Sequence, residues 1–456
     1  MLKNILETFR NCFRIPELRD RILFTLGLLA VCRIAAVIPT PGIDNEALRA
    51  YFAQRAQQGG MMALISMFTG GAFEHCAIGA LGIMPYISAT IVLQLFTAIW
   101  PSLAKLAREE TGRIKFIQYA RYLTVALCLG QGWFLAMTWE HPESLFSGFT
   151  GRLVIAENLF WFRIQTAIVQ TAGTMLLVWL GEQITERGIG NGVSLVITIG
   201  ILARLPAAIR GFIDMFITPG EEAQFNLGHL LVLIALFVGV VAGVVVLTQG
   251  QRKIPIQYAQ RAIGRRVFAG GTSYLPLRLN YSGVMPIIFA QAILMFPGQI
   301  FNGLYLRTKI DLFRDIAQLF HEHGFWYLVI YSVAILFFSY FWVATQFNEL
   351  QIAEDLKKNG AYIPGVRPGQ ATSEYLHNAM HRITFAGSLF LIVIAIMPLV
   401  LSGWMGVPPT VASFFGGTSL LITVGVLLDT MRQVETHLMM RHYDGFLKKG
   451  RLRGRF

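Results

Sequence analysis

Charge is scarce in this chain. Only 14% of its 456 residues are charged, whereas 54% are hydrophobic, and the mean hydropathy is +0.55. Soluble proteins carry about 25% charged residues. A chain with so little charge cannot cover itself with a solvated surface, so lipid must form part of its solvent. The composition therefore excludes an ordinary soluble multidomain protein.

Cysteine is also scarce, and the motifs of common catalytic and metal sites are missing. The four cysteines, Cys12, Cys32, Cys76 and Cys128, show neither metal-ligand spacing nor a disulfide framework. The sequence has no phosphate-binding GxxxxGK motif, no HExxH and no CxxC, and its nine histidines are dispersed. We therefore expect no catalytic residue, no metal and no cofactor. A membrane enzyme is disfavoured, and any nucleotide hydrolysis must come from a partner.

Long apolar runs, in contrast, recur from end to end. A helix of about 20 mostly apolar residues can cross a bilayer. We place ten spans at 22–38, 77–99, 122–139, 164–180, 193–205, 230–247, 284–301, 326–344, 383–401 and 414–428. The fifth and tenth are short and must borrow flanking residues. The predicted fold class is an all-α polytopic membrane protein with ten transmembrane helices.

The basic residues set the orientation. With ten spans both termini lie on one side, and Lys and Arg on that side outnumber those opposite by about three to one. Because cytoplasmic loops are enriched in these residues, we place both termini in the cytoplasm. Apolar residues at helical spacing predict an amphipathic interfacial segment at 1–21, and 437–456 is predicted as a basic tail. Most of the net charge of +12 thus reflects the enrichment of Lys and Arg in cytoplasmic loops. A nucleic-acid-binding protein is therefore disfavoured.

One cytoplasmic loop carries more charge than topology requires. Residues 249–280 hold six basic side chains and no acidic one. These side chains are Arg252, Lys253, Arg261, Arg265, Arg266 and Arg278. Such a loop is typical of a docking surface for an anionic partner.

The apolar segment before the second span is too short to cross. Residues 61–73 read MMALISMFTGGAF, with Gly70 and Gly71 as interruptions and Glu74 directly after. A re-entrant, folded-back helix fits this pattern and would imply an internal cavity. An amphipathic helix on the outer surface fits the stretch equally well.

Glycine and proline interrupt the second and seventh spans. Pro85 lies in the second, and Pro286 and Pro297 lie in the seventh. Proline kinks a helix. Because each of these spans is second in a set of five, we predict two pseudo-symmetric halves, 22–210 and 211–436. Between the fourth and fifth spans, GEQITERGIGNG at 181–192 predicts a tight turn.

A secondary transporter is the main rival, because transporters also use inverted repeats and broken helices. A transporter should bury ionisable residues at mid-membrane to coordinate a coupling ion. Only Arg33 and Asp429 are candidates here. This sparse set argues against a transporter.

Several segments resemble one known family. AIGALGIMPYISATIVLQL at 77–95 and WLGEQITERGIGNGVSLVI at 179–197 resemble the two signature segments of the SecY family of protein-conducting channels. MFTGGAFEH before the first, IPTPGID at 38–44, LKKNGAYIPGVRPG at 356–369 and FGGTSLLI at 415–422 are similar to further family segments. The resemblance covers nearly the whole chain in order. It implies ten helices in two five-helix halves around a central pore, with a folded-back plug helix.

The resemblance also implies a ring of aliphatic side chains at the waist of that pore. The matching residues are Ile83, Ile87, Val193, Ile197, Ile288 and Ile422. The family commonly has isoleucine where this chain has Val193. A narrow aliphatic ring offers water no hydrogen bonds, so it dewets and blocks ions when empty.

A plug and a lateral gate complete the implied channel. The plug would be 61–76, with Met67, Phe68, Gly70, Gly71 and Phe73 as its central residues. Spans two and three against seven and eight would form the gate, with Ser88, Ile91, Gln94, Gln131, Gln291 and Phe296 at the seam. Through this gate a signal peptide would reach membrane lipid.

The implied partners follow from the family. The cytoplasmic loops 249–280 and 347–382 would receive the ATPase SecA or the RNA of a ribosome. The expected contact residues are Arg252, Lys253, Arg265, Arg266 and Arg367. SecE and SecG would be permanent subunits, and signal peptides and nascent chains the substrates. The location implied is the bacterial inner membrane.

Overall fold

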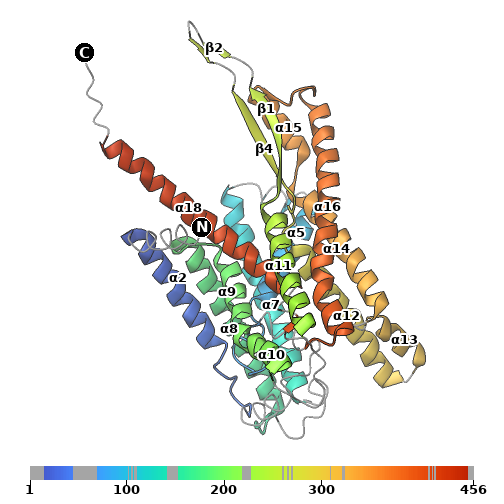
Figure 1. Cartoon of the computed structure of the whole chain (residues 1–456). Coiled ribbons are helices and arrows are strands. Elements are labelled where there is room, and N and C mark those ends of the chain that lie inside the picture. The colour runs from blue at the N-terminus through green and yellow to red at the C-terminus, as the bar shows by residue number, and fades with distance from the viewer. Residues whose placement is uncertain are drawn as a thin grey trace. The chain divides into compact units, whose positions relative to one another are not determined.

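The chain is mostly helical. The computed structural model describes residues 15–44, 69–100, 110–140, 153–217, 227–258, 261–263, 266–268, 271–308, 310–320, 324–408 and 417–449, with a few single residues between them. It divides into two compact units. Figure 1 labels the helices and strands along the chain. Unit 1 holds Met1–Asp214, Pro408–Thr410 and Gly425–Phe456, and unit 2 holds Met215–Val407 and Val411–Val424.

Unit 1 is built on two long helices, α7 (Glu110–Glu140) and α8 (Leu159–Arg187), which pack along each other. Helix α5 (Met84–Ile99) packs on α7, while α2 (Pro16–Ala35) and α9 (Gly192–Leu202) pack on α8. A core cluster joins the α7 residues Leu135 and Trp139 to Phe162 of α8 and to Phe73. Helix α10 (Leu205–Ile217) follows α9 after a two-residue break.

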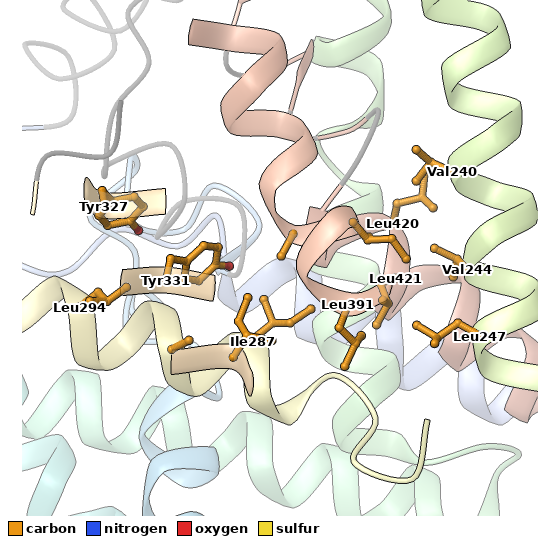
Figure 2. Close-up of a cluster of buried hydrophobic side chains, with 14 residues drawn as sticks. Val240, Val244, Leu247, Ile287, Leu294, Tyr327, Tyr331, Leu391, Leu420 and Leu421 are labelled. Carbon is orange, nitrogen blue, oxygen red and sulfur yellow. The ribbon is translucent and has the colours of Figure 1, made fainter. Parts of the chain in front are cut away.

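Unit 2 contains α11 (Leu227–Gln249), α12 (Met285–Thr308), α13 (Asp311–Leu319), α14 (Phe325–Gln346), α15 (Glu349–Lys358) and α16 (Gln370–Trp404). The first residues of α18 (Gly417–Lys449) also belong to it. Figure 2 shows its main buried cluster. Val244 of α11, Tyr331 of α14, Leu391 of α16 and Leu421 of α18 meet there with Ile287 of α12. This cluster holds five helices around one apolar core.

Many predicted spans coincide with apolar helices. Among the described residues, five helical segments are long and apolar enough to cross a membrane. They are Leu159–Arg187, Gly192–Ile213, Gly228–Gln249, Phe325–Lys358 and Gln370–Gly403. The other five predicted spans lie on α2, α5, α7, α12 and α18. The chain is thus a helical membrane protein with several spanning helices.

The all-α prediction needs a correction at loop 249–280. Strands β1 (Gln251–Tyr258) and β4 (Thr272–Arg278) pair antiparallel, and β2 (Arg261–Ile263) pairs with β3 (Arg266–Phe268). Ile254 and Leu277 are buried against α14 and α16 residues, which explains why the loop is ordered as strands. Strand β5 (Ala361–Tyr362) pairs with the far end of β1.

The second predicted span also begins later than expected. Its predicted range starts at residue 77, but α5 begins at Met84. Residues 77–83 form turns instead. Gly82 has a φ of +59°, which ends any helix there, and Pro85 occupies the first turn of α5.

Candidate functional site: a folded-back segment in unit 1

Residues 70–83 form a series of turns rather than a regular helix. Gly70 and Gly71 have φ angles of +64° and +87°. A Cβ atom on Gly70 would lie 2.7 Å from Cα of Gly200 on α9 and would press on the Arg33 guanidinium. Glycine is therefore required at position 70 by both its backbone angle and its close approach to α9.

The described part of this segment is buried. Ala72, Phe73 and Cys76 are almost without exposed surface. Its backbone groups find internal partners, for example Ala77 N–H with the Ala72 carbonyl at 2.9 Å. Non-helical backbone is tolerated at membrane depth only when it is buried and hydrogen-bonded in this way. Residues 70–76 of the predicted segment are thus mostly buried, hydrogen-bonded turns, and residues 61–68 lie outside the described part.

Two backbone hydrogen bonds join the segment to residues 38–40, which follow α2. Thr40 N–H donates to the Cys76 carbonyl, and Ile78 N–H donates to the Ile38 carbonyl, both at 2.9 Å. The Gln170 side chain, buried on α8, donates to the Ala77 carbonyl at 2.9 Å and to Thr40 Oγ1 at 3.0 Å. The base of the segment is therefore tied through polar contacts to α8 and to the stretch that follows α2.

Two arginines hold the tip of the segment. Arg33 of α2 donates from Nη2 to the Gly70 carbonyl at 3.0 Å. Arg204, in the break between α9 and α10, forms an ion pair with Glu74. Both arginines belong to unit 1, like the segment itself.

A small cavity of about 30 Å³ lies beside the segment. Arg33, Thr69 and Gly200 line it, together with Ile83 and Ile197. The structure thus brings two of the predicted ring residues to one cavity. A volume of this size has room for about one water molecule.

The remaining ring residues are buried or half-buried. Ile87 is buried on α5, and Val193 is half-buried at the start of α9. Ile288 of α12 and Ile422 of α18 are buried within unit 2.

The predicted plug and gate residues are only partly covered by the structure. Gly70, Gly71 and Phe73 are buried as described, whereas Met67 and Phe68 lie outside the described residues. On α5, Ile91 is buried, and Ser88 and Gln94 are half-buried. Gln131 of α7 and Gln291 of α12 are also half-buried. Phe296 is on α12, and its side chain lies outside the described residues.

Three of the five predicted docking residues lie on or next to one three-stranded sheet, β4–β1–β5. Arg252 and Lys253 are exposed on β1, and Arg367 is exposed in the turn after β5. Pairing of Gln257 with Tyr362 joins the loops 249–280 and 347–382 in one sheet. Arg266 lies on β3 with its side chain outside the described part, and Arg265 lies outside it altogether.

Sequence reasoning missed three residues that position the segment: Glu74 as an ion-pair partner, Arg204 and Gln170. Each is a polar residue inside or beside an apolar run, which is the signal that could have drawn attention to it. The partners of these residues could not be read from the sequence, because they are far apart along the chain. Arg204 lies 130 residues from Glu74, and Gln170 lies 93 residues from Ala77.

Apolar helices of membrane-crossing length, with a broken backbone segment buried among them, define a polytopic helical membrane protein of the channel or transporter class. Comparison with known proteins decides between the two. The SecY family model matches residues 77–431. The chain is 43% identical to the protein translocase subunit SecY of Chlamydia trachomatis, over 99% of this chain and 100% of that protein. The chain belongs to the SecY family.

Solved structures share the fold. One, described as that of a protein conducting channel, aligns with a TM-score of 0.54 and 17% identity over 92% of each chain. A second, at a TM-score of 0.51 and 17% identity over 92% of each chain, is of a SecY protein whose plug domain is described as stabilising the closed state.

Proposed function

We propose that the chain is the central subunit of a protein translocation channel. It passes unfolded secretory polypeptides across the membrane and releases transmembrane segments into lipid. The observation that carries this proposal is the match to protein translocase subunits along nearly the whole chain. As a channel subunit of the translocase family, the chain is not an enzyme.

The proposed architecture has ten spans in two five-helix halves, 22–210 and 211–436, between the cytoplasmic segment 1–21 and the tail 437–456. All ten predicted apolar runs overlap helices, which supports the count. The division of the chain after Asp214 lies near the proposed boundary at 210/211, whereas Pro408–Thr410 and Gly425–Phe456 group with the first unit. The Lys and Arg distribution supports cytoplasmic termini, in the bacterial inner membrane.

The pore ring is proposed to consist of Ile83, Ile87, Val193, Ile197, Ile288 and Ile422. Aliphatic side chains make no directional bonds, so the ring can close around any extended peptide without binding it tightly. When empty, the same ring offers water no partners and stays dry. The cavity shared by Ile83 and Ile197 supports an inward-facing position for these two.

Residues 61–76 are proposed as the plug over this ring, and spans two, three, seven and eight as the lateral gate. The apolar burial of Ala72 and Phe73 would favour the seated plug. A signal peptide has an apolar region of about 7–15 residues. Its transfer to lipid is favourable by about 0.8 kcal/mol per CH₂ group, so the substrate itself can drive opening of the gate.

SecE and SecG are the proposed permanent subunits. The joined loops 249–280 and 347–382 are the proposed docking surface for SecA or for ribosomal RNA. Exposed Arg252, Lys253 and Arg367 support this surface. An RNA contact of this kind would weaken as salt is raised.

A stalled secretory chain tests the channel directly. With the native cysteines replaced by serine, single cysteines at the six ring positions are expected to form disulfides with a cysteine in the stalled segment. Val238, which is 60% exposed on α11, provides a lipid-facing control. Equal crosslinking at Val238 and at the ring positions would contradict the proposed pore.

The plug has its own test. Deletion of 61–75 is expected to raise the ion current through reconstituted, substrate-free channels at least about tenfold, because nothing then covers the ring. Planar-bilayer conductance of the deletion variant and the intact chain measures the change. Unchanged conductance would remove the plug assignment while leaving the family membership intact.

A further inference from the structure

The folded-back segment and α9 meet at two points that are one helical turn apart. Gly70 packs against the backbone of Gly200, where even a Cβ atom would collide. Four residues further along each stretch, Glu74 pairs with Arg204. Ala203, which caps α9, keeps helical backbone angles, so Arg204 lies about one turn of 3.6 residues beyond Gly200, just past the end of α9. The segment is therefore seated on α9 in a defined register.

The Glu74–Arg204 pair is partly withdrawn from solvent. The side chains of Glu74 and Arg204 are 29% and 20% exposed. Pairs at fully exposed positions contribute little, because water and salt screen them. A partly buried pair is screened less, and removal of one partner leaves the other charge poorly solvated.

Backbone hydrogen bonds fix the position of Arg204 independently of its ion pair with Glu74. Its N–H donates to the Ile201 carbonyl at 3.1 Å, and its carbonyl accepts from Ala208 N–H at 3.0 Å. These bonds span the break between α9 and α10. The Arg204 side chain thus extends from a hydrogen-bonded connection between two helices, whereas Glu74 lies in the series of turns that forms the segment.

We infer that Glu74 and Arg204 form an electrostatic latch that holds the folded-back segment seated on α9. The inference rests on the proposed plug function of that segment. Displacement of the segment separates the two charges, so the latch biases the channel towards its closed form. Arg33, which donates to the neutral Gly70 carbonyl, gives a second attachment that would remain when the latch is broken.

The test uses the full-length chain with its co-purifying subunits in planar bilayers without polypeptide substrate. Glu74→Gln and Arg204→Gln are each expected to raise the ion current roughly fivefold to tenfold, the effect of losing one partner of a partly buried pair. The exchange variant Glu74→Arg/Arg204→Glu is expected to return the current to within about twofold of the intact chain, since it restores the pair. Membrane levels of each variant are compared first.

A matched control comes from a second ion pair of unit 1. Arg163 of α8 binds Glu140 of α7 through two hydrogen bonds of 2.8 and 2.6 Å. Arg163→Gln removes an ion pair between α7 and α8 in which no residue of the segment takes part, so the ion current should not change. A rise equal to that of Arg204→Gln would show a general loss of packing and would overturn the latch.

The deletion of 61–75 separates failure of the latch from failure of the plug. If the deletion raises the current but both single variants match the intact chain, the plug remains and the latch is wrong. The latch is also wrong if the exchange variant leaks as much as the single variants. If the deletion leaves the current unchanged, the plug and the latch both fail.

Discussion

Replacement of Gly192 by alanine is expected to prevent accumulation of the folded channel. A Cβ atom at Gly192, the first residue of α9, would press on the carbonyl oxygen of Gly181 in α8 and lie 2.8 Å from Cβ of Ile184. The nearest atoms belong to backbone, which cannot rotate away. Overpacking of this kind costs about 1–3 kcal/mol or more, and α8 and α9 would have to separate to relieve it.

The polar contacts of the turn make that separation costly. Thr185 Oγ1 accepts from Gly192 N–H at 2.8 Å and donates to the Gly181 carbonyl at 3.0 Å. Asn191 caps α9 by accepting from Ser194 N–H. Separation of the helices would break the bond between Gly192 and Thr185, which joins α9 to α8. Val193 and Ile197 would also move, because they follow Gly192 directly on α9.

Membrane level and thermal stability in detergent measure the effect. Gly243→Ala on α11 is the control, because a Cβ atom there meets nothing within 4 Å. Alanine is the better helix former, so this variant should be as stable as the intact chain or slightly more so. Equal melting temperatures for Gly192→Ala and Gly243→Ala would contradict the predicted close contact.

The helices could be predicted because their cause is local. A run of about 20 apolar residues must satisfy its backbone internally in lipid, and a helix is the way to do so. All ten predicted runs overlap helices for this reason. The turn between α8 and α9 could also be read from its glycines, but the predicted range 181–192 was too long: α8 continues to Arg187 and α9 begins at Gly192, so the turn is confined to 188–191. The contact of Gly192 with Gly181 could not, since nothing in the turn's sequence reveals how closely two helices approach.

The features that the sequence does not predict depend on tertiary contacts or on single backbone angles. Ile254 and Ile256 alternate with exposed residues on β1. This alternation is a strand signal in a loop whose most conspicuous feature is its basic charge. The turns at 77–83 replace predicted helix because Gly82 takes a left-handed angle. The partners of Glu74 and Gln170 depend on which helices meet. A single sequence does not contain that information in any local pattern.

Reversal of charge at Arg367 is expected to block export while the protein remains stable. The turn that carries Arg367 is fixed by backbone groups, with Val366 N–H donating to Ile363 at 3.1 Å. Thr372 Oγ1 donates to the Arg367 carbonyl at 2.9 Å. The Arg367 side chain is exposed, and substitutions at such positions usually change stability by less than about 0.5 kcal/mol. Arg367→Glu should therefore leave the membrane level and melting temperature unchanged.

The expected loss is in partner docking. A glutamate at position 367 would repel an anionic or acidic partner surface that the joined loops otherwise attract, so export should fall at least about tenfold. Translocation of a secretory precursor into membrane vesicles measures it. Lys358→Glu, at the exposed end of α15, makes the same charge change nearby and serves as the control. Lys358 is not among the proposed contact residues, so Lys358→Glu should reduce export far less. Normal export by Arg367→Glu would rule out this loop as the docking surface.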